Sequence, residues 1–136
     1  MRMAREAATM STCLRRQVGA VLVLDNRIIS TGRNGAPSKC KHCAEVGCIR
    51  QQRNIPSGTQ RELCRGAHAE ANAVTQVGRW MAKGSTLYCT NFPCSGCAKT
   101  IINGGVVRVV YSEDYNDGLS KELLAEAGVE VEQWLK

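Results

Sequence analysis

The second half of the chain alternates between helix and strand patterns, and this alternation restricts the fold more than any other feature. Apolar residues at helical spacing are followed by short β-branched or alternating runs, three times in succession. The expected helices cover residues 68–81, 94–103 and 119–127, and the expected strands cover 85–90, 106–111 and 129–131. Strands joined through helices run parallel, with the helices packed on the sheet. The sequence therefore predicts an α/β fold.

The first half adds a helix, a hairpin and an unusual segment. Residues 2–13 read as a helix, and 18–24 and 27–31 as two strands joined by a turn at Asp25-Asn26. The 136 residues predict one domain spanning 1–136. Residues 38–66 hold four of the eight cysteines and show little apolar periodicity. A segment of nearly 30 residues without regular structure is unusual unless a bound group holds it in place. We therefore expect a Cys-rich, zinc-binding insert there.

Composition narrows the class of protein. A disulfide scaffold is one explanation for eight cysteines, but such scaffolds are usually small, secreted and loop-rich, so metal binding fits better. No apolar run approaches the roughly 20 residues that span a bilayer, and the N-terminus lacks a signal-peptide pattern. We therefore expect a cytoplasmic protein without membrane association.

The charge suggests an anionic ligand. The chain has 18 basic and 12 acidic residues, a formal net charge of +6. An ordinary soluble surface explains this excess, and so does a nucleotide phosphate or a nucleic acid. Aromatic residues make up only 4% of the chain, which argues against a stacking surface for single strands.

Two short motifs carry the chemistry, namely His68-Ala69-Glu70 and Pro93-Cys94-Ser95-Gly96-Cys97. Cys94 and Cys97 are three residues apart at a predicted helix start, so both sulfurs can reach one ion, and the helix N-terminus favours thiolates. Three protein ligands leave a fourth zinc position open for water, as catalysis requires. The alternative is a closed structural site with Cys89 as a fourth ligand. The combined pattern is the signature of zinc-dependent nucleobase deaminases.

Glu70 is the candidate acid–base residue. His68 and Glu70 are two residues apart and diverge on a helix, so they converge only if the metal lies at the helix end. That edge of a parallel sheet is where ligands bind. Zinc lowers the pKa of bound water towards neutrality, and Glu70 then moves protons to N3 and to the amine leaving C4 of a cytosine-type base.

Several further segments resemble deoxycytidylate (dCMP) deaminases, and the likeness covers nearly the whole chain. The matching stretches are residues 11–21 (STCLRRQVGAV), 32–37 (GRNGAP), 68–73 (HAEANA) and 111–115 (YSEDY). The resemblance implies a cytidine-deaminase fold, a three-layer αβα arrangement with a central mixed five-stranded sheet. It implies a hydrolase acting on a cyclic amidine C–N bond, converting dCMP to dUMP and ammonia for thymidylate synthesis. It also implies a homo-oligomer, with a hexamer favoured.

The resemblance also assigns roles by position. It implies substrate-binding roles for Asn34, Ala69 and Tyr115. Arg16 is our candidate for the phosphate, with a surface salt bridge as the alternative. Many members have Gly-Tyr-Asn-Gly where this chain has Gly32-Arg33-Asn34-Gly35. That loop is linked to an allosteric dCTP effector accompanied by magnesium, so Arg33 and Gly35 are the candidate allosteric residues, and Arg33 leaves open whether this regulation exists.

A second, structural zinc is the remaining expectation. In related enzymes such an ion braces the segment before the His-x-Glu helix. Our candidate ligands are Cys13, Cys43, Cys48 and Cys64, with His42 or Cys40 as alternatives. A closed four-ligand site would pin a segment that has almost no core. The alternative is that several of these cysteines are free thiols.

Other readings compete with dCMP deamination. A tRNA adenosine deaminase shares both motifs, and a riboflavin-pathway deaminase fits less well. A non-catalytic zinc module that binds nucleic acid is the alternative from another class, although the open site and Glu70 argue against it. The sequence also leaves dCMP, dCTP and a modified cytosine nucleotide open as substrates.

Overall fold

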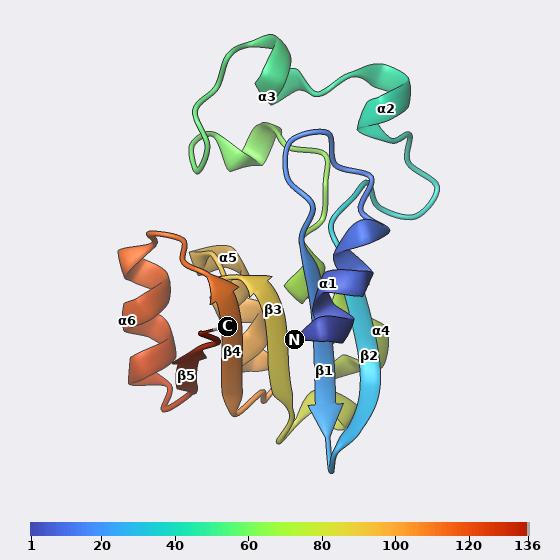
Figure 1. The fold of residues 1–136 in the computed structure, drawn as a ribbon. Coiled ribbons are helices and arrows are strands. Elements are labelled where there is room, and N and C mark those ends of the chain that lie inside the picture. The colour runs from blue at the N-terminus through green and yellow to red at the C-terminus, as the bar shows by residue number, and fades with distance from the viewer. Residues whose placement is uncertain (136) are drawn as a thin grey trace.

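A mixed five-stranded sheet forms the centre of the chain, for which the computed structural model describes residues 1–135 (Figure 1). Its strands are β1 (Gly19–Leu24), β2 (Arg27–Arg33), β3 (Thr86–Asn91), β4 (Arg108–Glu113) and β5 (Glu130–Gln133), in the order β2-β1-β3-β4-β5. β1 runs antiparallel to both β2 and β3, whereas β3, β4 and β5 run parallel. The parallel half is the one that the helix–strand alternation predicts.

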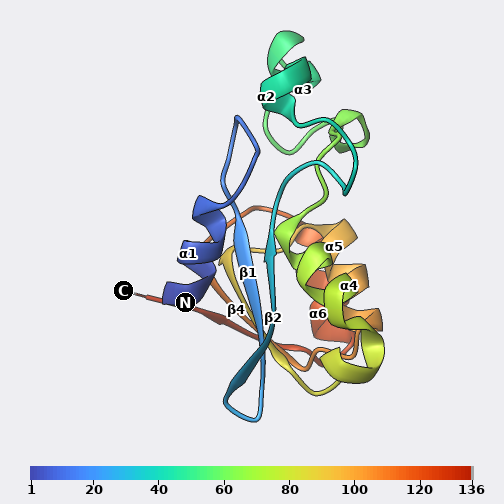
Figure 2. The same cartoon turned by 90° about the vertical axis from the view of Figure 1, so that its right-hand side faces the viewer.

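Helices cover both faces of this sheet. α1 (Arg2–Thr9) lies on one face, and α4 (Ala69–Ala82), α5 (Ser95–Asn103) and α6 (Gly118–Glu126) lie on the other (Figure 2). The core between these layers contains fully buried Leu22, Leu87, Ile101, Val109 and Leu124. The expected three-layer αβα fold class is confirmed. No helix within residues 1–135 has both the length and the apolarity needed to cross a bilayer.

The first helix ends earlier than its composition suggests. The sequence predicts a helix through residue 13, but α1 stops at Thr9. The Thr12 N–H then donates to the carbonyl of Asn34, 3.3 Å away in the loop after β2. This long-range bond places Cys13 in a loop that faces the insert instead of on a helix.

The contact between α4 and β2 is very close. Ser30 Oγ donates to the carbonyl of Ala73 at 2.6 Å, which ties the strand to the helix. A Cβ added to Gly32 would lie only 2.0 Å from the carbonyl oxygen of Ala69 and 2.7 Å from the nitrogen of Ala73. Glycine at this strand position therefore allows the N-terminal part of α4 to pack directly on the sheet.

The insert, residues 38–66, has little core of its own. It contains two short helices, α2 (Cys43–Val46) and α3 (Ile49–Gln52), and a 3₁₀ turn, η1 (Arg61–Leu63). Only Cys48 and Ile55 are buried within it. Figure 1 shows the insert beyond the edge of the sheet where β3 and β4 end. It therefore overhangs the edge at which α4 and α5 begin.

Candidate active site

Three metal-ligating side chains meet at the starts of α4 and α5. His68 is the N-cap of α4, Cys94 is the N-cap of α5, and Cys97 is the third residue of α5. His68 Nδ1 lies 3.4 Å from Cys94 Sγ and 3.3 Å from Cys97 Sγ. Within residues 1–135, no other group of three potential ligands has all its ligand atoms within 4.8 Å of one another.

The donor set and its spacing fit zinc. Tetrahedral zinc, with Zn–N of about 2.0 Å and Zn–S of about 2.3 Å, requires nitrogen and sulfur about 3.5 Å apart. The two observed distances fall just inside that value. Cys89, the candidate fourth ligand of a closed site, is fully buried in β3, and its thiol faces the carbonyl of Val110 at 3.8 Å. The three ligands thus leave one tetrahedral position open among the described residues.

Backbone conformation explains how His68 and Glu70 converge. His68 is extended, with ψ of 153°, because it precedes the first helical residue. Glu70 is the second residue of α4, is 4% exposed, and accepts a hydrogen bond from Cys97 Sγ at 3.7 Å. Burial raises the pKa of Glu70 above its ordinary value, which favours a carboxyl that can take up and release a proton.

The two thiols differ in acidity. The hydrogen bond with Cys97, supported by His68, lowers the pKa of Cys94 to about 3. The same pairing, together with burial, raises the pKa of Cys97. The hydrogen bond with Cys94 also raises the pKa of His68. One thiolate is therefore formed at neutral pH, and a bound cation would take the second by displacing a proton.

Asp117 connects three segments around the site. It is the N-cap of α6, and its carboxylate accepts from the N–H groups of Ser120 (3.0 Å) and Ser95 (2.9 Å) and from Arg61 (3.2 Å). Burial alone would raise the pKa of Asp117, but these two N–H bonds and the Arg61 guanidinium together lower it. An Asp before a helix predicts the cap of α6. No local pattern signals its reach to α5 and to the insert, and sequence reasoning missed it.

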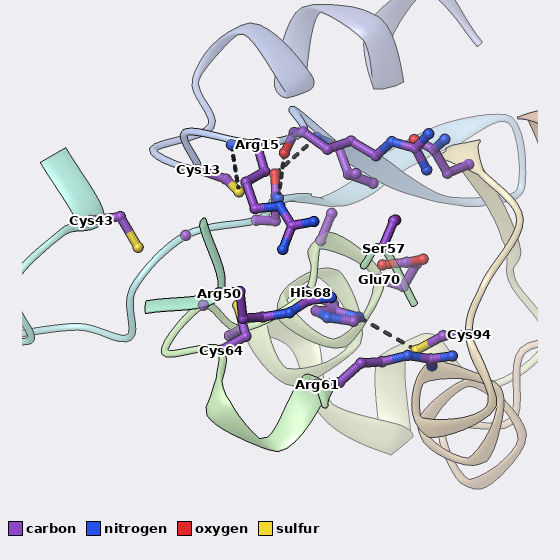
Figure 3. A pocket seen from close by; sticks show the side chains of 18 of the residues that line it. Cys13, Arg15, Cys43, Arg50, Ser57, Arg61, Cys64, His68, Glu70 and Cys94 are labelled. Carbon is purple, nitrogen blue, oxygen red and sulfur yellow. Dashed lines mark hydrogen bonds between the residues drawn. The ribbon is translucent and has the colours of Figure 1, made fainter. Parts of the chain in front are cut away.

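A pocket opens beside the metal-ligating group (Figure 3). Its walls come from the loops after α1 and β2, the insert and the starts of α4 and α5. All four predicted substrate residues line it, namely Arg16, Asn34, Ala69 and Tyr115. Arg15, Arg50 and Arg61 also line it, and sequence reasoning did not assign them. Their sequence signal is weak, because basic residues are frequent throughout the chain.

The side chain of Asn34 is already engaged by the scaffold. Its Oδ1 accepts from the N–H of Val18 at 2.8 Å, and its Nδ2 donates to the carbonyl of Arg16 at 2.8 Å. Asn34 therefore fixes the loop between α1 and β1 against the end of β2, in addition to facing the pocket.

The candidate allosteric residue Arg33 lines a second hollow, which shares Gly35 and Ala36 with the first pocket. Arg33 Nη1 donates to the carbonyl of Met10 at 2.6 Å. Cys40 and His42 also line the second hollow, and His42 Nδ1 lies 3.1 Å from Thr12 Oγ1.

The four favoured cysteines of the second metal site, three of them in the insert, line the first pocket. Cys13, Cys43, Cys48 and Cys64 all line it, whereas Cys40 does not. Burial and then the nearby Cys48, Cys64 and Cys13 raise the pKa of Cys43, so the four thiols are electrostatic neighbours. Their sulfurs are more widely spaced than the ligand atoms of His68, Cys94 and Cys97.

The fold and the site together define the class of protein to which the chain belongs. A sheet on which two helix starts present one imidazole, two thiols and a buried carboxyl around an open position is the arrangement of a zinc-dependent nucleobase deaminase. The model of the cytidine and deoxycytidylate deaminase zinc-binding region matches residues 1–113. The chain belongs to this family, as its motifs predict.

Individual relatives agree with this membership. The chain is 40% identical over 137 residues to a deoxycytidylate deaminase of Schizosaccharomyces pombe and 39% identical over 138 residues to that of Saccharomyces cerevisiae. These alignments cover 99% and 98% of this chain but only 42% and 43% of the relatives, so the chain spans about two fifths of their length. The crystal structure of a dCMP deaminase from the cyanophage S-TIM5, in complex with dCMP and dUMP, is 30% identical with a TM-score of 0.79. That match covers 98% of this chain and 92% of the other.

Proposed function

We propose that the chain hydrolyses dCMP to dUMP and ammonia with zinc as its cofactor. The observation that carries this proposal is the convergence of His68, Cys94 and Cys97 at two helix starts, with the buried carboxyl of Glu70 beside them. The relatives supply the substrate, because two yeast proteins of about 40% identity are deoxycytidylate deaminases and the cyanophage structure contains dCMP and dUMP.

The roles of the residues follow from their positions. Zinc, held by His68, Cys94 and Cys97, would supply a Lewis acid that acidifies a bound water. Glu70 takes up the proton lost by the attacking water and delivers it to N3 of the pyrimidine. It then carries the remaining proton of that water, now on the hydroxyl bonded to C4, to the amine, which leaves as ammonia as the bond between C4 and nitrogen breaks. The burial that raises the pKa of Glu70 suits a group that must be both acid and base.

The pocket suits a small nucleotide. Ala69 is the first residue of α4, so its N–H has no partner within the helix and is available to a ligand. The ring of Tyr115 lies under the guanidinium of Arg61, 5.4 Å from its carbon, and forms part of the wall. Asn34 is proposed at the deoxyribose and exposed Arg16 near the phosphate.

An ammonia-release assay tests the reaction. The substrates are dCMP, CMP, dCTP, deoxycytidine and a tRNA anticodon stem, each with and without dCTP as effector. We expect turnover with dCMP to exceed that with every other substrate. Greater turnover of the tRNA stem would instead indicate a tRNA adenosine deaminase. Tight nucleic-acid binding without ammonia release would indicate a non-catalytic zinc module.

The cysteine cluster supports a second, structural zinc. Cys13, Cys43, Cys48 and Cys64 line one pocket from four loop or helix-end positions. Burial and then the other three thiols raise the pKa of Cys43, which supports a site of four thiolate ligands. Such an ion would pin an insert in which only two residues are buried. Metal analysis should find two zinc ions per chain, falling to one in Cys48→Ser. The proposal fails if the unaltered protein holds one.

The remaining properties are proposals of the same kind. A homo-oligomer, with six subunits favoured, is tested by analytical ultracentrifugation. Regulation by dCTP with magnesium through Arg33 and Gly35 is tested by the effector arm of the assay. None of the eight cysteines, all of which lie within residues 1–135, forms a disulfide, which supports a reducing compartment such as the cytoplasm.

A further inference from the structure

The pocket has more positive charge than its own residues neutralise. Four arginines line it (Arg15, Arg16, Arg50 and Arg61), and Glu70 is its only carboxylate. Arg61 is paired with Asp117 at 3.2 Å. The other three arginines have no ion-pair partner within residues 1–135. A partly enclosed pocket with this excess of guanidinium groups is suited to an anion.

Arg15 and Arg50 are held in place by carbonyl groups of the insert. Arg15 Nη2 donates to the backbone carbonyl of Ile55 at 3.0 Å. Arg50 Nη2 donates to the backbone carbonyls of Thr59 at 2.9 Å and Pro56 at 3.3 Å. These bonds orient the two guanidinium groups, and neither group has a carboxylate partner within residues 1–135. Figure 3 shows both side chains extending into the pocket that contains His68 and Glu70.

Each of these two guanidinium groups also has an unused donor. Arg15 Nη1 and Arg50 Nε are buried and have no hydrogen-bond partner. A buried donor without a partner is costly, and a charged one more so, which makes such groups rare unless a ligand completes them. A phosphate offers several acceptor oxygens and the opposite charge, and it matches the planar fork of arginine.

We propose that Arg15 and Arg50 bind the 5′-phosphate of the substrate, so that the Cys-rich insert selects a nucleotide over a nucleoside. This inference rests on the proposed deamination of a deoxycytidine nucleotide. Arg16, in contrast, is exposed at the rim and has no buried donor without a partner. Arg15 and Arg50 therefore make the principal contacts with the phosphate.

The cysteine cluster positions both arginines. The backbone N–H of Arg15 donates to Cys13 Sγ at 3.5 Å, a bond drawn in Figure 3. Arg50 is the second residue of α3, whose N-cap is Cys48. Each arginine thus lies two residues after a cysteine of the cluster, so bracing the cluster fixes the backbone from which each side chain extends.

Binding measurements separate phosphate recognition from catalysis. Calorimetry is carried out with the zinc-loaded full chain, comparing dUMP with deoxyuridine. The variants are Arg15→Met and Arg50→Met, and the matched control is Arg53→Met, an exposed arginine of the insert outside the pocket. Each test variant should bind dUMP about 10- to 100-fold more weakly, as expected for a lost hydrogen bond to a charged group. Deoxyuridine binding should change less than threefold, and Arg53→Met should match the unaltered protein.

Two further variants keep the proposal falsifiable if a methionine disrupts the insert. Arg15→Lys and Arg50→Lys retain the charge and should recover part of the affinity for dUMP. Equal losses for dUMP and deoxyuridine would overturn the assignment, because a structural role alone predicts them. So would an unaltered protein that binds both equally. Absence of ammonia release from dCMP would instead reject the proposed reaction, which the binding data do not test.

Discussion

Replacing Gly32 by alanine tests whether the close contact between β2 and α4 positions the catalytic residues. The new methyl carbon would lie 2.0 Å from the carbonyl oxygen of Ala69, the first residue of α4. A carbon–oxygen contact needs about 3.3 Å, so strand and helix must separate by about 1.3 Å at this point. Zinc sites hold their ligand distances to within about 0.2 Å, so a shift of this size next to His68 is large.

We therefore expect Gly32→Ala to lower both stability and zinc affinity. Overpacking of this kind costs about 1–3 kcal/mol of unfolding free energy. Displaced support around a metal ligand typically weakens zinc binding about 10- to 100-fold, and dCMP turnover should fall with it. Urea unfolding measures the first effect, and competition with a chromophoric chelator measures the second.

Two other glycines provide matched controls. Gly118→Ala adds a methyl group with no atom within 4 Å and should change neither quantity. Gly19→Ala places its methyl 2.0 Å from the carbonyl of Ala4 in α1, on the opposite face of the sheet. It should lower stability but leave zinc affinity intact. Zinc affinity that is normal in Gly32→Ala, or equally reduced in Gly19→Ala, would refute the reasoning.

Three further predictions concern single residues. Glu70→Gln should retain zinc by metal analysis but lose about 10²- to 10⁴-fold in dCMP turnover, because the proton carrier is gone; near-normal turnover would exclude Glu70 from proton transfer. Asp117→Asn should lower the melting temperature by the same amount throughout pH 5.5–8. The folded-state pKa of Asp117 is lowered, so its contribution is complete above the unfolded value of about 3.9 and is lost only as pH falls through the folded value. A difference that varies across that window would contradict this. Gly78→Ala should cost about 1–3 kcal/mol in urea unfolding, because φ of 69° and ψ of 172° suit only glycine, while dCMP turnover stays unchanged.

Much of the parallel half of the fold follows from local pattern. The helix–strand alternation after residue 68 predicts β3, β4 and β5 and the helices between them, and both motifs fall at helix starts as expected. The family resemblance implies a mixed five-stranded sheet, but the antiparallel pairing of β1 with β3 was not predicted, because periodicity does not encode which strands become neighbours. Boundaries set by distant contacts were missed, as for α1, whose end depends on the bond between Thr12 and Asn34.

The residues of the site also fall into two groups, those that the sequence identifies and those that it does not. His68, Glu70, Cys94 and Cys97 are evident from sequence because zinc chemistry requires these side chains at these spacings. The pairing of Arg61 with Asp117 joins positions 56 residues apart, and no local feature indicates it. The helices of the insert are four residues each, too short to produce a periodic signal.

The two walls of the pocket come from different stretches of the chain, and this has an evolutionary consequence. The proposed metal ligands and Glu70 lie at the starts of α4 and α5, whereas a further part of the pocket lining belongs to residues 38–66, which contribute only two buried side chains. Substitutions, insertions and deletions in that segment can accumulate without disturbing the sheet or the helix starts. Descendants of a common ancestor can therefore diverge in the nucleotides they accept while keeping one hydrolytic apparatus. The bond from Arg61 to Asp117 sets the limit on this freedom, since it anchors residues 38–66 to the N-cap of α6 beside the start of α5.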